Sequence, residues 1–282
     1  MIGPSTRLAA LLGDPVDHSL SPRMHNAAFR HLGLDCRYLA FRVSGERFEE
    51  ALRGLGALGA LGANVTVPHK ERARRVVDAL DEDARACGAV NLVLFRRNGS
   101  AAWGANTDVA GLRATLDELP PPRREGALLL GAGGAARAAA LALAERTEGN
   151  LWVAARNPER IRDLEASLPG LEGRCRPLAW GDLPPEPWDL LVQATPLGLP
   201  SRPWDEAYLS RLLDAAPSRA LDLAYRPEGL TELEEASRRR GIPVASGRRL
   251  LLHQGVATFR LLTDREPPLE IMEQALEGGE AS

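Results

Sequence analysis

A glycine-rich turn between an apolar run and a helical segment constrains the fold of this chain more than any other feature. Residues 127–130 (ALLL) are apolar, and the sequence GAGGAA at 131–136 follows them, matching the pattern G-x-G-x-x-A. Glycines there let the backbone turn tightly and approach a pyrophosphate, which binds at the N-terminus of the next helix. Gly-Ala runs also open ordinary helices, but the strand-turn-helix context favours a nucleotide site. Its candidate residues are Gly131, Gly133, Gly134 and Ala135.

Short apolar segments alternate with amphipathic ones after this turn. The pattern predicts strands at 151–155, 189–193 and 219–223, with helices at 134–146, 158–168, 205–213 and 230–240. Strands that alternate with helices at this spacing form a parallel sheet with right-handed crossovers. We therefore expect a Rossmann-type doubly wound domain.

The first hundred residues show a second α/β pattern. It predicts strands at 7–12, 36–43 and 63–67, a hairpin from 89 to 104 around Asn98-Gly99, and helices at 23–32, 46–58, 69–77 and 81–87. Ser21 is expected to cap the first helix, with Pro22 at its first position. The proline-rich segment 117–124 suits a boundary between two units, and the tail from 248 predicts two helices.

Composition excludes several classes of function. A net charge of -3 gives no basic field for nucleic acid or an anionic membrane. No apolar run is long enough to span a bilayer, and the N-terminus lacks the pattern of a signal peptide. The three cysteines form no CxxC pair, and the histidines show no metal-ligand spacing. We expect a cytoplasmic protein with no nucleic-acid, membrane or metal partner; a homodimer is an open alternative to a monomer.

Lys70 is the only lysine among the 35 basic residues. One interpretation is that an arginine-favouring genome has replaced every other lysine and left this one by chance. The other is that Lys70 performs chemistry that arginine cannot, because an ammonium can give up a proton and a guanidinium effectively cannot.

Two arginines indicate which nucleotide binds. Sites for NAD place an acid about 20 residues after the glycine turn, where it accepts the ribose hydroxyls. Here the strand is followed by Arg156 and Arg160, and no acid stands at its end. Arginines can bind a 2'-phosphate through charge-assisted hydrogen bonds, which favours NADP. A solvated helix start is the alternative, and Glu159 is expected to cap that helix.

Six further motifs resemble the shikimate dehydrogenase family across essentially the whole chain. In order, they are HSLSP at 18–22, GANVTVPHK at 62–70, GAVN at 88–91, NTD at 106–108, DLAY at 222–225 and QG at 254–255. The resemblance implies an α/β protein of two domains. One is an α/β substrate-binding domain of residues 1–108 plus 247–282, and the other is a Rossmann-type NADP-binding domain of residues 109–246.

The resemblance also implies an activity and a set of site residues. The enzyme would use NADPH to reduce the ring ketone of 3-dehydroshikimate to shikimate. Lys70 would stabilise the resulting alkoxide and supply its proton, while Asp108 holds the ammonium. The implied substrate contacts are Ser19 and Ser21 to the carboxylate with Tyr225 nearby, and Thr66, Asn91 and Gln254 to the hydroxyls. Gly247 joins the cofactor contacts.

Alternatives stay open at single positions. Taken alone, Asp108 could be the cap of the helix that follows it. Ser21 could cap its helix, but capping would give no reason for Ser19. Asn64 could orient the loop between a strand and a helix. The family's Asn-Ala-Thr and Asn-Arg-Thr are Gln193-Ala194-Thr195 and Ala155-Arg156-Asn157 here, which puts NADP affinity in doubt. Rival functions are an NAD-dependent quinate/shikimate dehydrogenase and a non-catalytic metabolite-binding regulator of the same fold. A third rival is a folate-cofactor dehydrogenase of similar two-domain shape, but that function would not explain the paired serines, Ser19 and Ser21.

Overall fold

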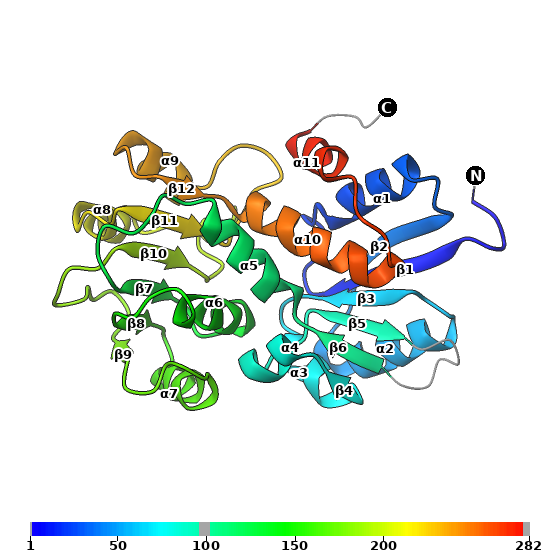
Figure 1. Cartoon of the computed structure of the whole chain (residues 1–282), viewed down its shortest axis with the longest axis horizontal. Helices are drawn as coiled ribbons and strands as arrows, with labels where there is room; N and C mark the ends of the chain where they lie inside the picture. Colours follow the sequence, from blue (N-terminus) through cyan, green and yellow to red (C-terminus); the bar gives the residue numbers. More distant parts are fainter. Residues whose placement is uncertain (1, 96–101, 279–282) are drawn as a thin grey trace. The chain divides into compact units, whose positions relative to one another are not determined.

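The structure is a computed structural model that describes residues 2–95 and 102–278. The chain divides into two compact units, the first made of Met1–Gly111 with Leu251–Ser282, and the second of Leu112–Leu250 (Figure 1). Helices α5 (Thr107–Asp117) and α10 (Gly247–Thr263) carry the chain from one unit to the other.

The first unit alternates strands and helices. Its other elements, in chain order, are β1 (Arg7–Gly13), α1 (Ser21–His31), β2 (Cys36–Arg42), η1 (Gly45–Arg47), α2 (Phe48–Ala57), β3 (Gly62–Val65), α3 (Lys70–Val76), β4 (Ala79–Leu80), α4 (Glu82–Cys87), β5 (Leu92–Phe95), β6 (Ala102–Ala105) and α11 (Leu269–Glu277). The strands form one sheet in the order β2-β1-β3-β5-β6-β4. It is mixed, because β1 pairs in parallel with both β2 and β3, whereas β5 is antiparallel to β3 and β6.

Two apolar layers cover this sheet. On one side Phe48, Leu52 and Leu55 of α2 pack in a buried cluster that includes Val65 of β3. The other layer involves α1, α10 and α11, where the fully buried rings of Phe29 and Phe259 lie 5.3 Å apart between centroids. These layers support the sheet, and with it the end of β3 and the start of α3.

The second unit is built around the glycine-rich turn. Its other elements are β7 (Ala127–Leu130), α6 (Gly134–Ala144), β8 (Leu151–Ala154), α7 (Pro158–Ser167), β9 (Cys175–Leu178), β10 (Leu190–Gln193), α8 (Glu206–Asp214), β11 (Arg219–Asp222), α9 (Glu232–Arg239) and β12 (Val244–Ala245). The strand order is β12-β11-β10-β7-β8-β9, and every pair is parallel (Figure 1). The order reverses between β7 and β10, and ligands bind at such a switch point in parallel sheets.

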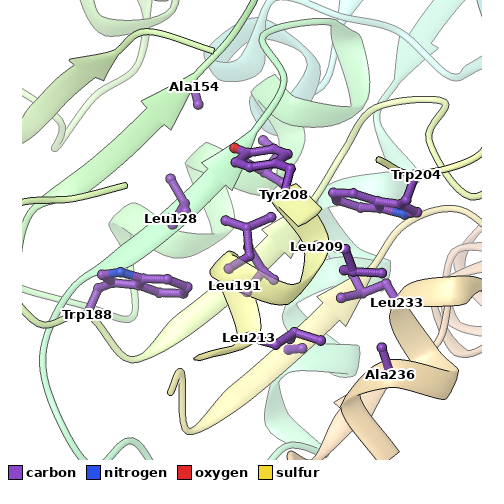
Figure 2. Close-up of a cluster of buried hydrophobic side chains, with 13 residues drawn as sticks. Leu128, Ala154, Trp188, Leu191, Trp204, Tyr208, Leu209, Leu213, Leu233 and Ala236 are labelled. Carbon is purple, nitrogen blue, oxygen red and sulfur yellow. The ribbon is translucent and has the colours of Figure 1, made fainter. Parts of the chain in front are cut away.

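The inner strands of this sheet are buried on both faces. All four residues of β7 and of β10 are buried, as expected for central parallel strands covered by helices. On one face Leu191 packs with Trp188, Trp204 and Tyr208 in a cluster with α8 and α9 (Figure 2). Alanines dominate α6, so that helix can lie close to the sheet.

The predicted fold class is confirmed, with local corrections. Helix α1 begins at Ser21, so Ser21 is not its N-cap; Leu20 occupies that position and makes no side-chain cap. No sequence pattern indicated β4, β9 or β12, of which β4 and β12 are only two residues long. The expected hairpin pairs as β5 and β6, while its turn around Asn98 and Gly99 lies outside the described residues. Within the described chain, no helix is both long and apolar enough to cross a membrane.

His25 is enclosed inside the first unit without a hydrogen-bond partner for Nδ1 among the described residues. Its ring stacks on Tyr38 at 4.5 Å between centroids and is 1% exposed. Burial lowers the pKa of His25 to about 3, because the charged form would lose its hydration.

This burial predicts a specific loss of stability in acid. The unfolded chain takes up a proton at His25 below its ordinary pKa of 6.5, whereas the folded chain does so only near 3. Between pH 7 and pH 5 the free energy of unfolding should therefore fall by about 2 kcal/mol through this residue. Denaturant unfolding should show that loss in the wild type and not in His25→Phe. His31→Phe, at an exposed position of the same helix, is the control; an equal pH dependence of wild type and His25→Phe would contradict the assignment.

Candidate active site

Lys70 and Asp108 form an ion pair in the first unit. Lys70 is the first residue of α3, Asp108 lies in the first turn of α5, and Lys70 Nζ donates to Asp108 Oδ2 at 2.5 Å. Each side chain is only 13% exposed. Water therefore screens the pair weakly, and the ammonium has one carboxylate oxygen to hold it in place.

Asn91 holds the other carboxylate oxygen. Its Nδ2 donates to Asp108 Oδ1 at 2.8 Å, and its Oδ1 accepts the backbone N–H of Thr107 at 2.7 Å. An N–H group can only donate, so the Thr107 contact fixes which end of the Asn91 amide faces Asp108. The structure makes Asn91 a support of the ion pair. Its expected contact with a substrate stays a prediction.

Asp108 does not cap helix α5. That function belongs to Asn106, whose Oδ1 accepts the backbone N–H groups of Asp108 at 3.1 Å and Val109 at 3.3 Å. The Asn106 amide nitrogen donates in turn to the Ala89 carbonyl at 2.8 Å. The alternative interpretation of Asp108 as a structural cap is therefore wrong.

His69 has a structural contact of its own. Its Nε2 lies 2.7 Å from the Val43 carbonyl, and its ring stacks on Phe48 at 4.7 Å between centroids. These contacts fix the residue directly before Lys70, so they orient the start of α3.

The paired serines stand at the start of α1. Ser19 Oγ accepts the backbone N–H of Ser21 at 3.3 Å. This contact does not cap the helix, because Leu20 is the N-cap residue and no side chain caps α1. The expected contact of Ser19 with a substrate stays a prediction. Ser21 is 7% exposed within the first turn of the helix.

The remaining predicted substrate residues of the first unit lie on two other elements. Thr66 follows β3, where its N–H donates to the Leu12 carbonyl at 2.9 Å. Gln254 lies on α10, is 8% exposed and donates from Nε2 to the Leu251 carbonyl at 2.9 Å.

In the second unit, the glycine turn lies at the switch point of the sheet. Gly131 has a φ of +116°, and a Cβ on it would lie 2.9 Å from the Ala194 carbonyl oxygen after β10. A side chain is excluded there by the fold itself. A Cβ on Gly133 would meet nothing within 4 Å, which leaves open space over the turn at the start of α6.

The two arginines of the cofactor motif are exposed on the segment that follows β8. Asn157 caps helix α7 by accepting the backbone N–H of Glu159 at 3.0 Å. The expectation that Glu159 is the cap is wrong. Arg156 precedes the cap and Arg160 lies in the first turn, where the helix dipole also favours an anion.

Two further predicted residues lie near the end of β11. Tyr225 is half-buried in the loop after that strand. Gly247 begins α10, and a Cβ there would lie 2.4 Å from the Ala224 carbonyl oxygen, so close packing excludes a side chain. Asp222 closes the same loop by accepting the Thr231 hydroxyl at 2.6 Å, and burial raises its pKa to about 7.

Comparisons with known proteins agree with this geometry. Residues 11–93 match the model of the shikimate dehydrogenase substrate binding domain, and 247–277 that of the shikimate 5'-dehydrogenase C-terminal domain. A shikimate dehydrogenase (NADP(+)) of Methanothermobacter thermautotrophicus is 40% identical, over 98% of each chain. This chain belongs to the shikimate dehydrogenase family.

Solved structures of a family member and of a related enzyme share the whole fold. The shikimate 5-dehydrogenase of Thermus thermophilus in complex with NADP(H) and shikimate has a TM-score of 0.79 and is 35% identical, over 96% of this chain and 98% of that one. A quinate dehydrogenase of Corynebacterium glutamicum in complex with NAD has a TM-score of 0.82 at 29% identity, over 96% and 98%.

Sequence reasoning missed several residues that organise this member of the family. Asn106 was noted only as part of a motif, and its function as a helix cap was missed. The signal was available, because Asn directly before a helix is a preferred N-cap residue. Thr107 reaches Thr258 of α10 at 3.0 Å between hydroxyl oxygens, and Tyr38 donates to Asn64 at 2.7 Å. No spacing in the sequence connects these residues, because the chain separates Thr107 from Thr258 by 151 positions.

The glycine turn predicts different outcomes for two similar substitutions. Gly131→Ala should lower both the thermal midpoint and NADP affinity, because φ is positive and the Cβ meets backbone; the strain should cost about 1–3 kcal/mol. Gly133→Ala should leave the midpoint nearly unchanged and weaken NADP binding only. Thermal unfolding and calorimetric titration with NADP+ separate the two effects. Equal losses of stability in both variants would refute this assignment.

Proposed function

We propose that this chain catalyses the reversible, NADPH-dependent reduction of 3-dehydroshikimate to shikimate, with Lys70 and Asp108 as its catalytic pair. The reaction is an oxidoreduction at a CH–OH group in the chorismate pathway, which leads to the aromatic amino acids. The observation that carries the proposal is the partly buried contact between Asp108 and the only lysine of the chain.

The chemistry requires a proton as well as a hydride. When bound, NADPH supplies the hydride to the ring carbonyl carbon. The Lys70 ammonium stabilises the negative charge that develops on the carbonyl oxygen and transfers a proton to it. Asp108 holds the ammonium through Oδ2, while Asn91 holds Oδ1, so the donor is in place before the reaction begins.

We assign substrate binding to residues of known placement. Ser19 and Ser21 at the start of α1 bind the carboxylate, because hydroxyls and the positive end of a helix both favour an anion. Thr66 and Gln254 bind ring hydroxyls, and Asn91 does so in addition to supporting Asp108. Tyr225 assists at the carboxylate.

NADP binding is assigned to the second unit. Gly131, Gly133, Gly134 and Ala135, at the N-terminus of α6, would hold the pyrophosphate. The exposed side chains of Arg156 and Arg160 bind the 2'-phosphate. Gly247 would contribute to the same cofactor site.

Two rival functions make distinct predictions. An NAD-dependent quinate dehydrogenase shares the fold, but the arginine pair and the missing acid after β8 favour NADP here. A non-catalytic regulator would not need the Lys70–Asp108 pair, which is intact. We also propose a cytoplasmic location, since the buried residues Cys36, Cys87 and Cys175 form no disulfide.

Absorbance at the nicotinamide band, with shikimate plus either NADP+ or NAD+, tests the function directly. Wild type should turn over with NADP+, while Lys70→Ala should lose about 10²- to 10⁴-fold in kcat. Lys70→Arg should lose nearly as much, because the charge remains but the proton is not transferable. NADP+ affinity is the control and should stay near normal in both variants. Substantial activity of Lys70→Arg would remove the proton-transfer role.

Cofactor choice should depend on the arginine pair. Neutral Gln at both Arg156 and Arg160 should lower the NADP-to-NAD ratio of kcat/KM by about 10²-fold or more, because two charge-assisted contacts exist only with the 2'-phosphate. The wild-type preference should shrink as salt rises. Arg162→Gln, at an exposed position of the same helix, is the matched control. A ratio that agrees with wild type within about threefold would contradict the assignment.

A further inference from the structure

The middle of helix α10, residues 254–259, packs closely against α1 and α5 within the first unit. A Cβ on Gly111 of α5 would lie 2.8 Å from the Gln254 backbone nitrogen, and a Cβ on Gly255 would lie 2.2 Å from Met24 Cε of α1. One turn further along, Phe259 packs against Phe29. Because two glycines permit this close packing, a change on α10 reaches the first turns of α5 directly.

Thr258 is a polar residue on this buried face. It is 0% exposed, and its Oγ1 accepts from Asn64 Nδ2 at 3.3 Å and lies 3.0 Å from Thr107 Oγ1. Asn64 also donates from Nδ2 to the Asn91 carbonyl at 3.1 Å. A single hydroxyl therefore links α10 to the loop before β5 and to the start of α5.

The Asn91 carbonyl oxygen can only accept, so it fixes the amide nitrogen of Asn64 on the side of Asn91 and Thr258. Tyr38 Oη donates to the other end of this amide, Asn64 Oδ1, at 2.7 Å. Either hydroxyl can donate in the contact between Thr258 and Thr107. The Thr107 hydroxyl in turn contacts the Asn91 amide, 3.0 Å from Nδ2 and 3.2 Å from Oδ1. Each link is buried, and the series ends where Asn91 donates to Asp108.

We propose that Thr258 is a positioning residue for the reaction: its hydroxyl, through Thr107 and Asn91, holds Asp108 and hence Lys70 in the reactive arrangement. The proposal rests on the proposed function. Thr258 also lies one helical turn from Gln254 on α10. The hydrogen bonds of the Thr258 hydroxyl therefore also fix the position of Gln254, the proposed substrate contact. Thr258 itself touches neither the ammonium nor the carboxylate.

The first test compares two substitutions at one position. Thr258→Val keeps the shape and removes the hydroxyl, and it should lower kcat about tenfold while the KM for NADP+ stays within about twofold. Thr258→Ser restores the hydroxyl and should return kcat to within about twofold of wild type. Thr263→Val on the same helix, whose Oγ1 only donates to the Phe259 carbonyl at 2.7 Å, is the control and should leave kcat unchanged. All rates are measured well below each variant's thermal midpoint.

A second variant keeps the proposal falsifiable if Thr258→Val folds poorly. Tyr38→Phe retains the ring that stacks on His25 and removes only the donor at the far end of the network. Tyr38→Phe should lower kcat about two- to fivefold. In the double variant, with Thr258→Val added, the fold loss of kcat should be smaller than the product of the two single fold losses. A kcat for Thr258→Val equal to wild type, or no rescue by Thr258→Ser, overturns the proposal. So does a wild-type kcat for Tyr38→Phe where Thr258→Val does not fold.

The wild-type assay separates this proposal from the proposed function. Absence of wild-type turnover with shikimate and NADP+ sinks the proposed function, and the positioning role falls with it. Normal wild-type turnover, with Thr258→Val also normal, leaves the function standing and removes Thr258 alone. Calorimetric titration with shikimate adds a reading without turnover: Thr258→Val should still bind it, within about threefold of wild type.

Discussion

The first unit depends on an ion pair that is largely withdrawn from water. Burying two charges costs several kcal/mol per ion, and their attraction offsets this only when further hydrogen bonds satisfy them. Asn91 meets one oxygen of Asp108 and Lys70 meets the other. The Asn91 amide is itself held by Thr107. Much of the polar interior around β3, β5 and α5 can be understood as the support that this pair requires.

The second unit depends on backbone geometry in place of charge. Parallel pairing brings the ends of β7 and β10 to one edge, and the reversal of strand order there leaves space outside the sheet. At that edge the Gly131 backbone packs directly against Ala194, so no side chain fits. Gly133 has open space where a side chain would be. Two glycines in one motif thus have different physical reasons: the first is required by the fold, and the second leaves room for a ligand.

Local patterns revealed the fold and singled out Lys70, whereas long-range contacts stayed hidden. The glycine turn, the strand periodicity and the single lysine are each visible within a short window. The cap of α7 was open to local reasoning but was assigned to Glu159, whereas Asn157 makes it. For α5, Asp108 was considered only as the alternative cap, and Asn106 makes that contact. The two-residue strands leave too short a pattern to detect. The contact of Asn64 with Thr258 spans 194 positions, so only the folded structure reveals it.

The discontinuous first unit has a consequence for the order in which the chain folds during synthesis. Every residue of the second unit has been made by Leu250, and nothing beyond that point is needed to close its parallel sheet. The first unit, although synthesised earlier, lacks α10 until Thr263 has been added. Until then Asn64 and Phe29 lack their contacts with that helix. The surface that α10 later covers, which includes both apolar and polar side chains, therefore stays exposed. Nascent chains expose such surfaces to aggregation and to chaperones. The first unit is therefore completed only after the whole second unit has been synthesised.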